Sequence, residues 1–105
     1  MMRRFAVSVL LISIGIFLLT AATDRRSLMM RQARNLETAS RYSDAREVYR
    51  ELLRLHPGYF NALEKLVTNL LRENLTDEAE EEITKFKGKI IPEQRTRLQV
   101  LVLLR

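Results

Sequence analysis

The chain has 105 residues, enough for one domain at most, and a formal net charge of +5. It contains no cysteine and one histidine, which excludes a disulfide framework, a thiolate metal site and a cysteine nucleophile. The basic excess is largest near an apolar N-terminal segment, so anionic lipid headgroups account for it more simply than nucleic acid does.

The first element is an uncharged stretch at residues 5–22, FAVSVLLISIGIFLLTAA. As a helix it would span roughly 27 Å, close to the thickness of the bilayer hydrocarbon core. We expect a signal anchor over residues 1–24, because the stretch is long and Arg25 and Arg26 follow it closely. A cleaved signal peptide that ends before Thr23 is the open alternative. A buried soluble helix is disfavoured, since the stretch is apolar around its whole circumference.

The two orientation signals of this segment disagree. Lysine and arginine counts slightly favour a cytoplasmic location for the C-terminal side, where Arg25, Arg26, Arg31 and Arg34 follow. The signal-like layout, with a short basic start and an apolar middle, favours export of that side instead. We expect a single-pass membrane protein whose soluble domain, residues 25–105, lies outside the cytoplasm.

Apolar residues recur at helical spacing through the remainder of the chain. The clearest case is YSDAREVYRELLRLHP at residues 42–57, which ends at its proline because proline cannot donate into a helix. Ser43 and Thr76 are predicted N-caps. Gly88 is a predicted helix terminator, and Pro92 suits the first turn of the last helix. The predicted helical segments cover residues 27–39, 42–57, 59–72, 76–88 and 93–104.

The apolar pattern repeats at an interval of 34 residues. Ala45 and Tyr49 are followed by Ala79 and Ile83 at this offset. Three further pairs at the same offset are Met29 with Leu63, Ala33 with Val67, and Leu36 with Leu70. This register resembles the tetratricopeptide repeat, which has the same period and places small, aromatic and proline residues at fixed points. The resemblance covers residues 26–91.

Each copy matches the tetratricopeptide pattern in part. The positions in register are Ala33, Ala45, Tyr49 and Pro57 in the first copy, and Leu63, Leu66 and Ala79 in the second. The departures are Met29, Gln32 and Leu36 in the first copy, and Val67 and Pro92 in the second. A generic bundle of four or five helices would carry similar apolar stripes and stays open, but the shared register favours the repeat.

The expected fold is all-α, with an N-terminal transmembrane helix followed by two tetratricopeptide-like helical hairpins and a C-terminal helix. Two repeats are few for such a stack, because no unit has a full core of its own. The end of the chain, LQVLVLL at residues 98–104, is apolar where a terminal helix should have a polar outer face. Three explanations stay open: it packs as a fifth helix, it contacts another protein, or the chain is a subunit of a larger assembly.

No set of residues indicates catalysis. His56, the single imidazole, is expected to cap carbonyl groups at a helix end. The acidic run at residues 77–82 would spread around a helix, so a solvated first turn is favoured over a metal site. Arginines alternate with glutamates in residues 42–57, which argues against a phosphate-tracking surface. We therefore predict no enzymatic activity, cofactor, metal, nucleic-acid partner or small-molecule substrate.

In tetratricopeptide proteins the first helices of successive pairs line a concave groove, so the resemblance implies that a partner protein would bind there. The basic set with which some family members grip a C-terminal carboxylate is not recognisable, since Met30 and Glu64 stand where polar or basic groups would be needed. The six candidate groove residues are Arg34, Thr38, Asn61, Glu64, Thr68 and Arg72.

These features predict a membrane-anchored adaptor or accessory protein that mediates protein–protein interaction. Its partners would be the lipid bilayer and a membrane-associated protein, which would bind as a helix or extended peptide in the groove. Two alternatives stay open. One is a structural subunit of a membrane complex, with the spanning helix and the apolar C-terminus as its contacts. The other is a secreted helical protein with a cleaved signal.

Overall fold

The computed structural model describes residues 25–104, and every regular element in that part of the chain is a helix. The predicted all-α class is thereby confirmed for these residues. A first helix spans residues 25–38. It is followed by α2 (Tyr42–Leu55), α3 (Phe60–Arg72), α4 (Thr76–Phe86), a 3₁₀ turn η1 (Lys87–Lys89) and α5 (Pro92–Leu103).

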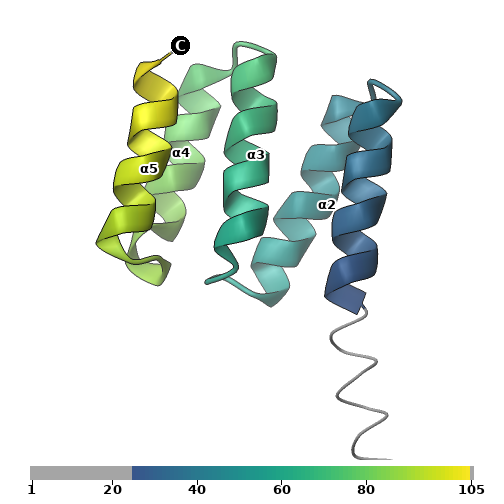
Figure 1. Cartoon of the computed structure of the whole chain (residues 1–105), viewed down its shortest axis with the longest axis horizontal. Coiled ribbons are helices and arrows are strands. Elements are labelled where there is room, and N and C mark those ends of the chain that lie inside the picture. The colour runs from purple at the N-terminus through teal and green to yellow at the C-terminus, as the bar shows by residue number, and fades with distance from the viewer. Residues whose placement is uncertain (1–24, 105) are drawn as a thin grey trace, which may run out of the picture.

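Successive helices run antiparallel and form two layers (Figure 1). The first helix, α3 and α5 make one layer, and α2 and α4 make the other. The central helix α3 contacts α2, α4 and α5. Its apolar face is fully buried through Leu63, Leu66, Val67 and Leu70. The core therefore centres on α3, and the other helices pack around it.

The apolar stripe of α2 faces this core, as its spacing predicted. Ala45, Tyr49 and Leu52 have no exposed surface. The helix ends where the proline was expected to end it, and the His56 backbone N–H donates to the Leu52 carbonyl at 2.8 Å. Alanines at equivalent points, Ala45 in α2 and Ala79 in α4, are both buried without residual exposure. Small side chains at these points allow the close approach of neighbouring helices.

The two hairpin turns have the same geometry at an offset of 34 residues. Ser40 and Asn74 both adopt the left-handed conformation, each with φ of 61°. In the first turn the Arg41 N–H donates to the Leu36 carbonyl at 2.8 Å, and in the second the Leu75 N–H donates to the Leu70 carbonyl at 2.9 Å. This is the Schellman arrangement, which satisfies the last carbonyls of the preceding helix.

These turns explain why the predicted N-caps are wrong. The cap positions belong to Arg41 and Leu75, which make no side-chain cap hydrogen bond, and Ser43 and Thr76 lie inside the helices. The Schellman turn places the residue after the left-handed one at the start of the next helix, and Leu75 packs there against the core. A backbone arrangement thus sets the helix start in place of a hydroxyl cap.

The predicted terminator role of Gly88 is also wrong. Helix α4 ends at Phe86, and the glycine lies inside the 3₁₀ turn η1 without a positive φ. The prediction for Pro92 is confirmed, because this residue opens α5. The Ile91 N–H, just before the helix, donates to the side-chain carbonyl of Gln94 at 3.2 Å, which satisfies this backbone group at the helix start. Pro92 itself has no N–H to satisfy.

Helix α5 packs down as the fifth helix of the stack. Leu98 is fully buried, and Leu101 and Val102 pack against the core formed with α3 and α4. Apolar side chains are exposed at the C-terminal end of the same helix, where Leu103 is 82% exposed and Leu104, just after the helix, is 78% exposed. Packing as a fifth helix therefore explains the buried residues of the apolar C-terminus. It does not explain the leucines that stay exposed at its end.

Among the helices of residues 25–104, none combines the length and apolar composition needed to cross a membrane. The predicted spanning segment, residues 5–22, lies outside the described residues.

We expect Tyr49→Ala to lower the free energy of unfolding by about 3–5 kcal/mol, because it removes a fully buried aromatic side chain. The total free energy of unfolding of a domain of this size is small. The loss of helicity should therefore occur at a lower temperature in thermal unfolding followed by circular dichroism. Ser43→Ala, at an exposed position of the same helix, should change stability by less than about 0.5 kcal/mol. Identical melting curves for the two variants would contradict a core role for Tyr49.

Candidate groove between the first helix and α3

A polar network lies at the junction of the first helix, α2 and α3. The Tyr49 hydroxyl of α2 donates to Glu37 Oε1 of the first helix. Asn69 of α3 donates from Nδ2 to Glu37 Oε2 at 3.2 Å and to the Tyr42 carbonyl at 3.3 Å. Arg46 of α2 donates to Asn69 Oδ1 at 2.9 Å and pairs with Glu73. The network thus joins three helices through side chains on each of them.

Burial makes this network costly to disrupt. Asn69 and Tyr49 have no exposed surface, and a buried polar group without a partner costs about 1–3 kcal/mol. Each of the two has a partner here, as buried polar groups normally do. The helical spacing of residues 42–57 predicts Arg46 on the face opposite the apolar stripe, but this is wrong because its side chain is only 11% exposed. Helix α3 covers this edge of α2, and Asn69 of α3 and Glu73, just after α3, are the partners of Arg46.

The environment of the Tyr49 hydroxyl favours its protonated form. Burial and then the Glu37 carboxylate raise the pKa of Tyr49 above its usual value of 10.0. The positive charges of Arg34 and Arg72 act in the opposite direction. These two arginines therefore lie close enough to interact electrostatically with the Tyr49 hydroxyl.

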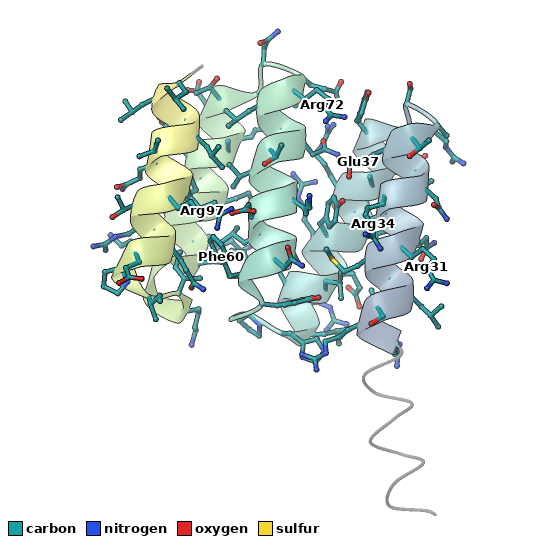
Figure 2. The ribbon with its side chains drawn as sticks, in the orientation of Figure 1. Arg31, Arg34, Glu37, Phe60, Arg72 and Arg97 are labelled. Carbon is teal, nitrogen blue, oxygen red and sulfur yellow. The ribbon has the colours of Figure 1, made fainter. Side chains whose placement is uncertain are left out.

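Above the network, a surface hollow lies between the first helix and α3. It has a volume of about 300 Å³ and is lined by Arg34, Glu37, Thr38, Lys65, Thr68 and Arg72. Figure 2 shows Arg34 and Glu37 on the first helix and Arg72 on α3, in the same layer of the fold. Four of the six predicted groove residues thus come together here: Arg34, Thr38, Thr68 and Arg72.

The other two predicted residues do not line the hollow. Asn61 is exposed near the start of α3. Glu64 contacts Arg97 of α5, whose Nε lies 2.9 Å from Glu64 Oε2, and Figure 2 shows Arg97 on the neighbouring helix. Glu64 therefore joins two helices of the same chain. Met30, which the resemblance placed near the groove, is buried in the core.

Positive charge prevails in the hollow. It is lined by three cations, Arg34, Lys65 and Arg72, and by one carboxylate, Glu37, which accepts bonds from the network on both oxygens. Within residues 25–104, none of the three cations has a carboxylate partner within 4.0 Å. The Arg72 guanidinium lies 5.4 Å from the centre of the Tyr42 ring, which restricts its motion.

The two threonines of the hollow are turned toward their own helices. Thr38 Oγ1 donates to the Arg34 carbonyl at 3.0 Å, and Thr68 Oγ1 donates to the Glu64 carbonyl at 2.8 Å. Their hydroxyl protons are therefore used, and the cations are the groups available for recognition. Lys65 was not among the predicted groove residues, although Lys65, Thr68 and Arg72 share one helix face at spacings of three and four.

Comparison with protein-family models, curated proteins and solved structures finds no match to this chain. The site must therefore be interpreted from its own chemistry. No three His, Asp or Glu side chains of the described residues lie close enough together to hold a metal ion. Of the acidic run, Glu82 and Glu78 reach Arg50 of α2 at 3.4 and 3.9 Å, on the layer opposite the hollow.

We expect the free energy of unfolding to fall as the pH rises above about 10, because the unfolded chain then releases the Tyr49 proton while the folded chain retains it. The contribution of the Tyr49 hydroxyl to stability is complete below that pH. It is lost as the pH rises toward the higher pKa that Tyr49 has in the folded chain. Tyr49→Phe should remove the part of this decrease in the free energy of unfolding that comes from Tyr49. Tyr59→Phe should leave the decrease unchanged. Urea unfolding across this pH range measures the difference, and parallel curves for both variants would contradict the interpretation.

Proposed function

We propose that this protein is a membrane-anchored adaptor whose hollow between the first helix and α3 binds an acidic segment of a partner protein. The observation that carries the proposal is the unequal charge of the hollow. Arg34, Lys65 and Arg72 line it, and the oxygens of Glu37, its one carboxylate, are held by Tyr49 and Asn69. The role is binding, without catalysis.

The fold supports binding by holding these cations on rigid elements. Arg34 lies on one helix, and Lys65 and Arg72 lie on another, with the buried network fixing their relative position. Preorganised charges lose less freedom on binding, and arginine can pair with a carboxylate through two parallel hydrogen bonds. A hollow between two helices with three cations in its lining suits a helix or an extended peptide with several carboxylates.

The resemblance to the tetratricopeptide repeat supports the same proposal. In that family, successive hairpins present their first helices to a partner, and the hollow here lies between the first helix and α3. The apolar stretch at residues 5–22 would anchor the chain in a bilayer, with the helical part outside the cytoplasm. The partner would then be a protein at the same membrane.

A structural subunit of a membrane complex is the second candidate, and the exposed leucines at the end of α5 favour it. Leu103 and Leu104 are mostly exposed. Leu103 also lines a hollow with Glu80, Ile83, Thr84, Gln99 and Val102. Apolar side chains of this kind are common at permanent interfaces. In that case the co-purification of a partner would be lost when Leu103 and Leu104 are changed. It would be unaffected by charge reversal in the hollow between the first helix and α3.

The adaptor proposal can be tested by binding the purified full chain in detergent to an array of random peptides. Enriched peptides should contain an excess of aspartate and glutamate. Lys65→Glu should weaken their binding about tenfold, the equivalent of roughly 1.4 kcal/mol for one close ion pair. Lys85→Glu makes the same charge change on α4, in the opposite layer, and should leave binding unchanged.

Enrichment without any charge preference, or equal effects of Lys65→Glu and Lys85→Glu, would contradict recognition in the hollow. Affinity purification from detergent-solubilised membranes would identify the natural partner. The same pair of variants would then show whether that partner uses the hollow.

The anchor can be tested separately. We expect the full chain to stay in the pellet when membranes are washed with alkaline carbonate, because an apolar helix of this length is not released by loss of electrostatic contacts. The mature N-terminus, measured by mass spectrometry, should precede residue 5. A mature protein that begins at Thr23 would support the cleaved signal and overturn the anchor.

A further inference from the structure

One end of the helical stack gathers basic and apolar side chains from segments far apart in the sequence. The start of the first helix, the turn between α2 and α3, and the η1 turn before α5 all lie at this end (Figure 1). We call it the basic end. Its exposed cations include Arg25, Lys87 and Lys89, and Arg26 lies half-buried beside them.

Contacts between these segments make the basic end one continuous surface. The Arg26 guanidinium lies 5.7 Å from the centre of the Tyr59 ring. The turn at Gly58 packs against the carbonyl of Lys89, which would lie 3.4 Å from a Cβ placed on the glycine. A hollow also joins the first helix to the end of α2; its lining residues are Arg25, Arg26, Met29, Leu55 and His56.

Large apolar side chains are exposed among these cations. Leu28 is 57% exposed, Leu55 39% and Ile91 55%. Glu93 is the acidic residue beside them in α5, and Glu51 of α2 is already paired with Arg54 at 2.5 Å. Cations mixed with exposed aliphatic side chains are typical of surfaces that rest on lipid headgroups.

The opposite end of the stack differs in charge. Two of its arginines are paired with carboxylates, Arg41 with Asp44 at 2.6 Å and Arg46 with Glu73, and Arg72 at the end of α3 lies over the Tyr42 ring. Helix α4 begins there with exposed carboxylates at Asp77 and Glu78. The two ends therefore carry different electrostatic character, and only one of them suits an anionic surface.

Chain length places the basic end beside the membrane. The apolar stretch ends at Ala22 and the first described helix begins at residue 25. Three residues span at most about 10 Å when fully extended. If residues 5–22 cross the bilayer, as the proposed function holds, the start of the first helix stays within about 10 Å of the hydrocarbon core, in or next to the headgroup layer.

We infer that the basic end of the stack rests on anionic phospholipid headgroups, an inference that depends on the membrane anchor of the proposed function. Arg25, Arg26, Lys87 and Lys89 pair with lipid phosphates, and Leu55 and Ile91 enter the interfacial layer. Helical rise then puts Arg34 and Thr38 roughly 14–20 Å farther from the membrane. The hollow is held clear of the lipid and open to a partner.

The absence of cysteine allows a direct test with single labels in the full chain. Ile91→Cys and Ser43→Cys place an environment-sensitive fluorophore at the basic end and at the opposite end. Each labelled chain is reconstituted into phosphatidylcholine discs with about 30% phosphatidylglycerol and a headgroup spin label. We expect several-fold stronger quenching at position 91 than at position 43, and weaker quenching at position 91 in neutral discs or high salt.

Charge variants in the labelled Ile91→Cys chain sharpen the test. Lys89→Glu should reduce quenching in anionic discs, and Arg41→Glu, the same charge change at the opposite end, should not. Equal quenching at positions 91 and 43, or quenching that ignores lipid charge, would overturn the lipid contact while leaving the anchor intact. A chain that does not remain with the discs would overturn the anchor and this inference together.

Discussion

The Glu37 carboxylate is the constraint on which the rest of the structure depends. Removing a carboxylate from water is expensive unless hydrogen bonds replace its hydration. Here Tyr49 and Asn69 supply those bonds from two other helices. The first helix is therefore held in one register against α2 and α3. Because both of its oxygens accept these bonds, Glu37 pairs with neither Arg34 nor Arg72, and the two arginines stay available in the hollow.

Ion pairs between alternate helices supplement this network on both layers. Arg50 joins α2 to α4 through Glu82, and Arg97 joins α5 to α3 through Glu64. Partly exposed pairs contribute little free energy, typically below about 1 kcal/mol, so their main effect is on register. The apolar core supplies the stability, and the polar ties determine which helix faces meet.

Helix positions could be predicted from the sequence because a stripe at helical spacing is a local signal, clear in α2 and α3. The helix starts could not, since Ser43 and Thr76 gave way to backbone turns at Ser40 and Asn74. The buried network was missed because the partners of Asn69 depend on how three helices are rotated about their axes. Four hollow residues were predicted through the tetratricopeptide resemblance. Lys65 was missed, although its spacing from Thr68 and Arg72 already places it on the same helix face.

The antiparallel stack has a kinetic consequence. Each side-chain hydrogen bond described between helices joins residues at most 33 positions apart, the longest being Arg97 to Glu64. Loops of this length close at modest entropic cost, and folds rich in short-range contacts form in microseconds to milliseconds. Each hairpin can therefore form as soon as its second helix has been synthesised. The docking of Asn69 against Glu37, between residues 32 positions apart, then joins the second hairpin to the first.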